Sequence, residues 1–384
     1  MTDSSPQFEP NAWIEIDSDA LTSNAIALRE FVTGSASSPE LIAVVKADGY
    51  GHGAVTAAKA FTAGGVGRFA VTTLDEAAAL VRGGIDPAVT PILVFAPIVT
   101  PSQANAAALL GVEPTICDPH HVRLLVAAAE TTGRVVNVHL KVDTGMGRLG
   151  DPPIDACRTA RLIAATPALK LVGTYTHFAN ASDTDLASTR AALARFTGCC
   201  DALSADGISP GLRHAANSAA TLRLPEARLD AVRLGTVLYG QYPSAAVPKV
   251  PNLNANTWQA KARVVFVHNL PAGATVGYGS EVTLRKPTRV AVIAIGYADG
   301  YEMSPNSMFK GQRGVNSLVK QALGNNVPRV YLHDTAAPVL GRVAMQMIVV
   351  DVTALGDKVK EGDIANVPMR RLAASAHLPR VETT

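Results

Sequence analysis

Short apolar runs alternate with helix-like stretches along the first two thirds of the chain. Several runs are apolar at consecutive positions, which is typical of parallel strands that helices cover on both faces. The stretches between them carry helix-start signals: Thr73-Leu-Asp-Glu76 has the spacing of a capping box, and Asp118-Pro119 is an N-cap residue followed by proline. The eight apolar runs are 41–45, 69–73, 91–95, 113–117, 136–142, 171–176, 211–215 and 230–233.

Eight strand–helix units in about 230 residues match the make-up of a (β/α)₈ TIM-like barrel. An α/β fold is therefore expected for the N-terminal part, with the barrel over residues 12–243. An open doubly wound sheet shows the same alternation and stays open as the alternative fold at this point.

The pattern changes after Tyr242. A proline-rich stretch predicts a linker, and four further apolar runs follow at 262–267, 289–295, 337–343 and 347–352, with turn signals between them and little helical periodicity. They predict a smaller, mostly-β C-terminal domain, which residues 1–11 and 244–384 would form together with the linker.

Composition excludes several classes of function. Apolar residues make up 48% and charged residues 17% of the 384 positions, which suits a large buried core and argues against disorder. Lys and Arg number 34 against 32 Asp and Glu, for a net charge of +2, and there is no basic block. Neither a nucleic acid nor an anionic membrane surface is therefore expected as a partner.

The sequence predicts neither an export signal nor a membrane-spanning segment. Its first ten residues are polar, and no apolar run approaches the roughly 18–20 residues that cross a bilayer. Four cysteines lack metal-ligand spacing, and the nine histidines form no HExxH motif, so no metal site is expected. Reduced thiols in a cytoplasmic protein are the preferred interpretation.

In a barrel, reactive side chains gather at the C-terminal ends of the strands. Lys46 ends the run Leu-Ile-Ala-Val-Val, where partial desolvation lowers the pKa of a lysine and makes it a Schiff-base candidate. Position alone favours the other interpretation, a lysine whose charge reaches solvent along a flexible stem. Other strand-end residues are Lys141, Asp143, Arg148, His177, Asn217, Ser218, Arg233 and Gly235.

The last two strand ends suggest an anion site. Asn217-Ser218 and Arg233-Leu-Gly235-Thr236 follow them, and barrels often bind phosphate there. A Schiff-base lysine on an early strand together with a phosphate site on late strands suggests pyridoxal phosphate, PLP. The segment 145–150 also matches GxGxxG, but Asp-Pro-Pro follows it where a dinucleotide-binding fingerprint requires a helix, so that reading is weak.

These residues resemble the bacterial-type alanine racemases, which are fold-type III PLP enzymes. The segment Ala-Val-Val-Lys46-Ala-Asp-Gly-Tyr50-Gly-His-Gly is similar to the cofactor-lysine signature of that family. Similar motifs follow in the family's order: Lys141-Val-Asp-Thr-Gly-Met-Gly-Arg148-Leu-Gly, Tyr175-Thr-His177-Phe-Ala, Ala-Asn217-Ser218-Ala, Val-Arg233-Leu-Gly-Thr, Val-Gly-Tyr278-Gly, Ile-Gly-Tyr297-Ala-Asp-Gly and Gly-Arg342-Val-Ala-Met345. Together they span residues 12–365.

The resemblance implies an isomerase that racemises L-alanine and D-alanine and supplies D-alanine for peptidoglycan. Lys46 would bind PLP and act as the base on one face of the substrate. Tyr278 from the second subunit of a homodimer would act on the other face, because racemisation requires a proton acceptor on each side of Cα.

The resemblance also assigns the remaining site residues. Arg148 and Met345 would bind the substrate, with Tyr297 and Lys141 in support. Lys141 matches a lysine that is carbamylated in some members, and Arg233 would face the pyridine nitrogen. The cofactor-binding set would be Lys46, Tyr50, His177, Ser218, Arg233, Gly235 and Thr236.

Three features depart from the family pattern. Gln346 stands where the family usually has aspartate. The stretch 302–336 is longer than usual, and the usual late tyrosine has no clear counterpart, with Arg370 or Arg371 as the candidate replacements. These departures keep open a racemase for another small amino acid such as serine, or a non-enzymatic PLP-binding protein. The Cys-Asp pair that the related decarboxylases carry in their second domain is not found in the second domain of this sequence, which argues against that class.

Overall fold

The computed structural model describes residues 9–33, 38–303 and 327–383. The chain divides into two compact units. Residues 18–257 form one unit, and the described parts of 1–17 and 258–384 form the other. The predicted boundaries of 12–243 for the barrel, and of 1–11 with 244–384 for the β domain, therefore differ from the observed units at both ends.

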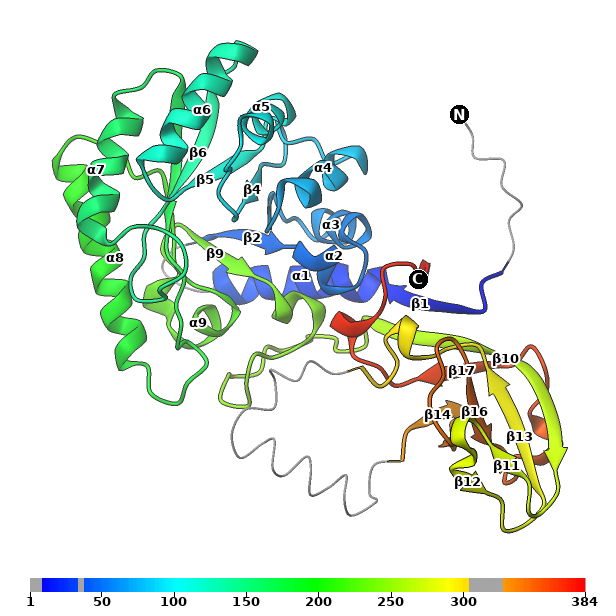
Figure 1. Ribbon diagram of the computed structural model, residues 1–384. Helices are drawn as coiled ribbons and strands as arrows, with labels where there is room; N and C mark the ends of the chain where they lie inside the picture. The colour runs from blue at the N-terminus through cyan, green and yellow to red at the C-terminus, as the bar shows by residue number, and fades with distance from the viewer. Residues whose placement is uncertain (1–8, 34–37, 304–326, 384) are drawn as a thin grey trace. The chain divides into compact units, whose positions relative to one another are not determined.

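The first unit is a closed parallel barrel of eight strands, which confirms the barrel and removes the open-sheet alternative (Figure 1). The last strand pairs with the first, with Glu40 opposite Ala231 and Ala43 opposite Leu234. All eight predicted runs are strands. They are β2 (Glu40–Val44), β3 (Arg68–Val71), β4 (Ile92–Val94), β5 (Glu113–Ile116), β6 (Val136–Lys141), β7 (Leu169–Tyr175), β8 (Leu212–His214) and β9 (Ala231–Leu234).

Helices follow the strands and cover the barrel (Figure 1). The predicted capping box is present: the Thr73 hydroxyl accepts from the Glu76 amide at 3.3 Å, and the Glu76 carboxylate accepts from the Thr73 amide at 3.0 Å. A cap of this kind contributes about 1 kcal/mol. The helices are α1 (Ser18–Thr33), α2 (Lys46–Tyr50), α3 (Ala54–Ala63), α4 (Leu74–Arg82), α5 (Pro101–Leu110), α6 (Pro119–Thr132), α7 (Pro153–Ala164), α8 (Ala187–Ala205), α9 (Ser218–Arg223), η1 (Pro225–Ala227) and η2 (Thr236–Tyr239).

The second unit is built on an eight-stranded sheet in the order β13-β16-β15-β14-β17-β10-β1-β18. Residues 12–17, expected to open the barrel, form β1 of this sheet because they pair antiparallel with β10 and parallel with β18. The strands are β1 (Ala12–Asp17), β10 (Trp258–Leu270), β13 (Thr288–Ile293), β14 (Arg329–Leu332), β15 (Thr335–Leu340), β16 (Ile348–Asp351), β17 (Ile364–Val367) and β18 (Arg380–Thr383). A small hairpin adds β11 (Thr275–Val276) and β12 (Val282–Thr283).

The four runs predicted in this unit lie in β10, β13, β15 and β16. Part of the long stretch 302–336 is also sheet, since Arg329–Leu332 is β14 and pairs with β15. Residues 304–326 of that stretch lie outside the described residues. Short turns labelled η3 (Tyr278–Ser280), η4 (Tyr297–Asp299), η6 (Gly356–Lys358) and η7 (Arg371–Ala373) connect the strands.

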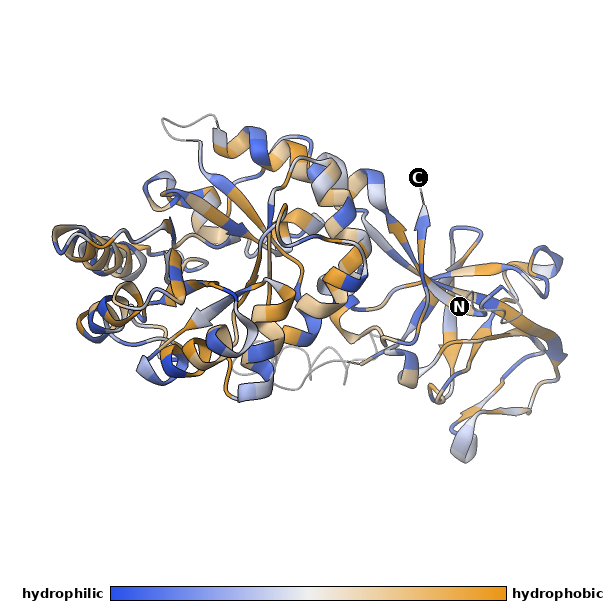
Figure 2. Ribbon diagram, turned by 90° about the horizontal axis from the view of Figure 1, so that it is seen from above, coloured by the Kyte–Doolittle hydropathy of each residue, from blue (hydrophilic) through white to orange (hydrophobic). Residues whose placement is uncertain are grey.

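Hydrophobic residues lie on the barrel strands, which are buried on both faces. Hydropathy mapped on the chain shows apolar residues on the barrel strands (Figure 2). A buried cluster of Ile42, Val44, Ala70, Leu93 and Ala231 fills part of the barrel interior. Within the described ranges, no helix is both long and apolar enough to cross a bilayer.

Candidate active site

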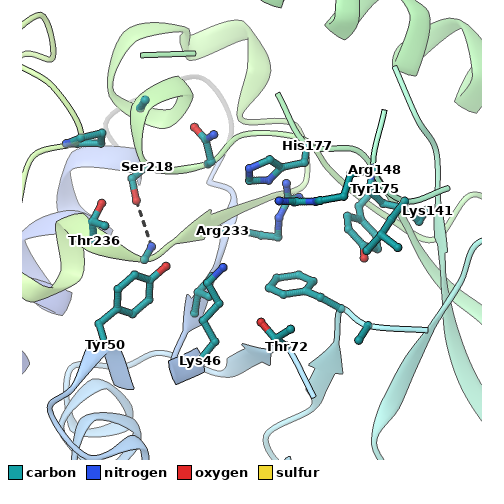
Figure 3. Close-up of a pocket in the computed structure, with 18 of the residues that line it drawn as sticks. Lys46, Tyr50, Thr72, Lys141, Arg148, Tyr175, His177, Ser218, Arg233 and Thr236 are labelled. Carbon is teal, nitrogen blue, oxygen red and sulfur yellow. Dashed lines mark hydrogen bonds between the residues drawn. The ribbon is translucent and has the colours of Figure 1, made fainter. Parts of the chain in front are cut away.

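A cavity of about 450 Å³ is lined by residues at the C-terminal ends of the barrel strands and in the loops that follow (Figure 3). Nine of the predicted site residues line it, although they come from segments far apart in the sequence. Their convergence is what the barrel topology predicts. They are Lys46, Tyr50, Lys141, Arg148, His177, Ser218, Arg233, Gly235 and Thr236.

The cavity is strongly cationic. Lys46, Lys141, Arg148 and Arg233 line it, and no acidic side chain is among the described residues of its wall. Burial lowers the pKa of Lys46, and the nearby Arg148 lowers it further. Burial likewise lowers the pKa of Lys141 to about 8, with Arg233 adding to the effect. The site therefore suits a ligand that carries several negative charges.

His177 is an uncharged polar group in this cationic cavity. Burial lowers the pKa of His177 to about 3, and the positive charges of Arg233 and Arg148 act in the same direction. At neutral pH its ring therefore offers one donor and one acceptor without adding another cation.

Lys46 is followed by a turn with left-handed backbone. Ala47, Asp48, Gly49 and Tyr50 have φ values of 50°, 52°, 61° and 53°. Each L-residue in this conformation costs about 1–2 kcal/mol relative to a right-handed turn, and only glycine avoids the cost. The reversed winding carries the chain from the lysine to the tyrosine, so that both side chains line the cavity (Figure 3).

Two carboxylates hold this strained turn in place. The Glu76 carboxylate accepts from the Ala47 amide at 2.7 Å, and also from the amides of Thr72 at 2.7 Å and Thr73 at 3.0 Å. The Asp48 carboxylate accepts from the Ala54 amide at 2.9 Å. The capping residue of α4 thus also supports the backbone next to the cavity lysine, a role that its cap motif does not disclose.

Hydroxyl groups gather at the end of the cavity formed by β8 and β9. The Ser218 hydroxyl accepts from the Gly235 amide at 3.1 Å, and the hydroxyls of Tyr50 and Thr236 also face this region (Figure 3). Glycine is required here: a Cβ on Gly235 would lie 2.4 Å from the Tyr50 hydroxyl oxygen. Hydroxyls packed this closely against a bare backbone form a cradle for an anion such as phosphate.

Arg233 is held rigidly by backbone and imidazole acceptors. Its Nη1 donates to His214 Nδ1 at 2.9 Å and to the His214 carbonyl at 2.7 Å. Its Nη2 donates to the carbonyls of Thr176 at 2.6 Å and Ala215 at 3.0 Å. Both terminal nitrogens are therefore committed, and only Nε lacks a hydrogen-bond partner among the described residues. Burial lowers the pKa of Arg233 to about 10, so the guanidinium stays protonated.

The loop 145–150 shows why the GxGxxG match is not a dinucleotide site. Asp151 and Pro152 follow the loop outside any helix, and helix α7 begins only at Pro153. The Asp143 carboxylate accepts from the amides of Gly145, Met146 and Gly147 at 2.8–2.9 Å. These bonds outweigh partial burial and lower the pKa of Asp143. The loop amides are thus already occupied, and the loop instead presents Arg148 to the cavity.

The other three predicted residues lie on the β unit and do not line this cavity. Tyr278, Tyr297 and Met345 are 72%, 45% and 58% exposed. Backbone hydrogen bonds from Tyr297 to the Ala344 carbonyl at 3.1 Å, and from Ala298 to the Met345 carbonyl at 3.0 Å, bring two of them side by side.

Sequence reasoning missed several polar residues of the barrel. Tyr175 lies under Lys141 and Arg233, with its ring centre 5.4 Å from Lys141 Nζ and 5.3 Å from Arg233 Cζ. Glu113, His139 and His214 lie inside apolar strand runs, and a polar residue in a strand buried on both faces is the signal that identifies them.

Comparison with known proteins agrees with this geometry. The model of the alanine racemase N-terminal domain matches residues 16–243, and that of the alanine racemase C-terminal domain matches 257–376. Alanine racemase from Desulfovibrio desulfuricans is 38% identical over 374 residues, which cover 96% of this chain and 93% of that protein. Alanine racemase from Carboxydothermus hydrogenoformans is 40% identical over 292 residues, or 75% of this chain and 76% of that protein.

Solved structures show the same relationship. Alanine racemase from Streptomyces lavendulae superposes with a TM-score of 0.80 at 28% identity, over 98% of each chain. That from Clostridium difficile gives a TM-score of 0.84 at 25% identity, over 98% of this chain and 97% of the other. With both domain models matched and relatives similar along nearly the whole length, the chain belongs to the alanine racemase family of isomerases.

Proposed function

We propose that the protein interconverts L-alanine and D-alanine with pyridoxal phosphate held in the barrel cavity. The observation that carries this proposal is the cavity itself. Among the described residues of its wall are four basic side chains and no carboxylate, with a desolvated lysine on one side and a hydroxyl cradle on another. The phosphate of the cofactor and the carboxylate of an amino acid are the anions that such a wall accommodates.

The residues present fit the cofactor. Lys46 would bind its aldehyde carbon, and Arg233 would donate through Nε to its ring nitrogen. The cradle of Tyr50, Ser218 and Thr236 would hold its phosphate. Gly235 has no side chain and so leaves space for the phosphate there. When bound, pyridoxal phosphate draws electrons from the substrate and so acidifies the bond between Cα and its hydrogen.

The chain's own residues would then move the proton. Lys46 has a lowered pKa, which favours the neutral amine, and would accept or return the proton at Nζ on one face of Cα. Arg148 would hold the substrate carboxylate, with Met345 contacting the substrate and Tyr297 supporting this surface. A protonated Arg233 would donate to the ring nitrogen of the cofactor and would favour its uncharged form, which would disfavour transamination.

Tyr278 of a second subunit would act on the opposite face, with His177 as its neutral neighbour. Racemisation needs an acceptor on each side of Cα, and Tyr278 is 72% exposed on the β unit, available to another copy of the chain. A two-fold homodimer with shared sites follows from this assignment.

Proton NMR in D₂O tests the proposal. The protein is incubated with added pyridoxal phosphate and, separately, with L-alanine, D-alanine and L-serine. We expect the α-proton signal to disappear from both alanine enantiomers, and chiral chromatography to show racemic product. Exchange with serine but not alanine would change the substrate, in line with Gln346 in place of aspartate. No exchange with any amino acid would refute the racemase assignment.

The glycine of the cradle gives a first prediction. Gly235→Ala places a methyl group 2.4 Å from the Tyr50 hydroxyl oxygen, so one of the two must move. We expect cofactor affinity to fall about ten- to a hundredfold. Titration of cofactor-free protein, followed by absorption, measures it. Gly198→Ala on α8 is the control, since its added Cβ meets nothing within 4 Å. Equal affinities in both variants would contradict a tight cradle.

Lys141 gives a second prediction, carbamylation of its amine by carbon dioxide. Burial lowers the pKa of Lys141 to about 8, so the reactive neutral amine becomes abundant as the pH rises through that value. The nitrogen would bond to carbon, lose a proton and become an anion beside the cavity cations. We expect a protein-bound ¹³C signal in ¹³C-bicarbonate that strengthens between pH 7 and 9 and is absent in Lys141→Arg. A signal of equal strength in that variant would rule out Lys141 as its source.

A further inference from the structure

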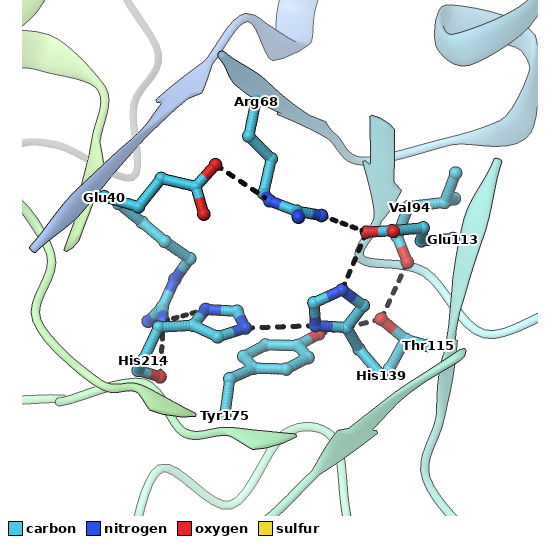
Figure 4. Close-up of polar contacts among 9 residues, drawn as sticks. Glu40, Arg68, Val94, Glu113, Thr115, His139, Tyr175 and His214 are labelled. Atoms are coloured by element: carbon cyan, nitrogen blue, oxygen red, sulfur yellow. Dashed lines mark hydrogen bonds and ion pairs between the residues drawn. The ribbon is translucent and has the colours of Figure 1, made fainter. Parts of the chain in front are cut away.

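A network of polar side chains runs through the barrel interior from Arg68 and Glu113 through His139 to His214 (Figure 4). It ends at Arg233, which donates to His214. Glu113 Oε2 accepts from Arg68 Nη1 at 2.5 Å and lies 2.9 Å from His139 Nε2. His139 Nδ1 lies 3.1 Å from His214 Nε2, and His214 Nδ1 lies 2.9 Å from Arg233 Nη1. Glu113, His139 and His214 do not line the cavity, so they form a layer behind Arg233.

The contacts allow one order of protons along this network. Arginine only donates, so Nδ1 of His214 must accept and its proton must sit on Nε2. That proton points at His139 Nδ1, which must therefore accept, so the His139 proton sits on Nε2 and is donated to Glu113. Oε2 of Glu113 accepts from both Arg68 and His139, which favours the ionised carboxylate. Reversing either ring would set two donors against each other.

The charge states agree with this order. Burial lowers the pKa of His214 well below its usual value, and Arg233 reinforces the effect, so the ring is neutral. Burial alone raises the pKa of Glu113, but the hydrogen bonds from His139 and Arg68 outweigh it and keep the carboxyl ionised.

The backbone is shaped to hold the two rings. Val138 pairs with Leu171 while His139 pairs with Gly173, so Val172 is an extra residue in β7. A Cβ on Gly173 would lie 2.4 Å from His139 Nδ1, so this position leaves room for the imidazole. On the other ring, Tyr175 stacks on His214 with centroids 5.0 Å apart and planes at 11°. Tyr175 is itself fixed by a 2.9 Å hydrogen bond to Thr115.

We propose that Glu113 and His139 are positioning residues, which keep the proton of His214 on Nε2. His214 then accepts from Arg233 through Nδ1. This contact fixes the guanidinium, and its Nε is the donor that stays available for a ligand. Neither residue touches the cavity, and both act through His214. The consequence for the cofactor rests on the proposed function, whereas the proton order does not.

The proton order is tested first in the unsubstituted, cofactor-free protein. Histidine is labelled with ¹⁵N, and proton–nitrogen correlation spectra identify which ring nitrogen carries hydrogen. We expect Nε2–H on both His139 and His214, with the two signals assigned from His139→Asn and His214→Gln spectra. A His214 signal with hydrogen on Nδ1 would overturn the proposal. This readout stands whether or not the protein racemises alanine.

The effect on Arg233 is tested with two substitutions at one position. His139→Asn places an amide oxygen where Nδ1 was, so His214 keeps its acceptor; His139→Leu removes it. We expect His139→Leu to weaken cofactor binding about tenfold and to shift the absorption of the bound cofactor. His139→Asn should stay within about threefold of the parent, because one of the two hydrogen bonds of the ring is restored.

His121→Leu is the control for loss of a buried histidine. His121 lies on α6, is 6% exposed and takes no part in the hydrogen-bonded series that ends at Arg233. Its cofactor affinity and absorption should match the parent even where its thermal stability falls. Equal affinity in His139→Leu and the parent would overturn the positioning role. So would equal losses in His139→Leu and His139→Asn, because the restored acceptor would then have no effect.

Discussion

Replacing Lys46 with alanine is expected to lower the rate of α-proton exchange on alanine by about 10⁴-fold or more, because it removes the cofactor attachment and one base together. The lysine has no substitute in the cavity wall. Lys141 is the nearest in type, but its amine donates to the Val142 carbonyl at 2.8 Å. The measurement is loss of the α-proton signal of L-alanine and D-alanine in D₂O.

The matched control is Lys59→Ala, which removes an exposed lysine from α3 and should leave exchange unchanged. Adding a small primary amine such as methylamine to Lys46→Ala should restore part of the exchange, since the amine supplies the lost base. Exchange within tenfold of the parent in Lys46→Ala would contradict the assignment of Lys46. A loss in Lys59→Ala of the same size would point to a general effect of charge removal.

Replacing Tyr278 with phenylalanine is expected to lower exchange by about 10²- to 10⁴-fold for one alanine enantiomer and much less for the other. The reason is that each base serves one face of Cα. The side chain is 72% exposed, so the fold should tolerate the loss of its hydroxyl, and the thermal midpoint should not change. The control is Tyr331→Phe on β14, which removes another partly exposed hydroxyl from the same unit.

Mixing two inactive proteins tests where Tyr278 acts. If it serves the cavity of a second subunit, a dimer of one Lys46→Ala chain and one Tyr278→Phe chain contains one intact site. Statistical re-association should then recover about a quarter of the parental activity. No recovery, in a mixture shown to have exchanged subunits, would place Tyr278 and Lys46 of one site in the same chain. Parental activity in Tyr278→Phe alone would refute the two-base mechanism.

The sequence predicted the barrel well because each strand is buried on both faces and so reads as a continuous apolar run. It predicted the β unit less completely. β1 was placed with the barrel because its six residues adjoin α1, whereas its partner β10 begins at Trp258. Strands of two to four residues, such as β11, β14 and β18, are too short to show a periodicity. Their existence depends on pairing between distant segments.

The residues of the candidate site also fall into those that the sequence predicts and those that depend on contacts between distant segments. Residues at strand ends were predictable because the barrel brings all such ends together, as Lys46 and Arg233 show. Residues that act through a contact with another side chain or with the backbone were not predictable from the sequence. Glu76 is visible in sequence as a helix cap, but its bond to the Ala47 amide depends on the packing of α4 against α2. Glu113 and His139 can be seen in sequence as polar residues in apolar runs, but the contact between them depends on the closed barrel.

The place of β1 in its sheet has a consequence for how the chain matures on the ribosome. β1 leaves the ribosome before the other described strands, yet its neighbours β10 and β18 come from residues 258–270 and 380–383. Synthesis of the residues between β1 and β10, at about 5–20 residues per second, takes tens of seconds. During that time the residues of the barrel are being made, while β1 has no β10 or β18 to pair with and carries the apolar residues Trp13, Ile14 and Ile16. β1 is therefore available as a binding segment for chaperones until β10 and β18 have been made.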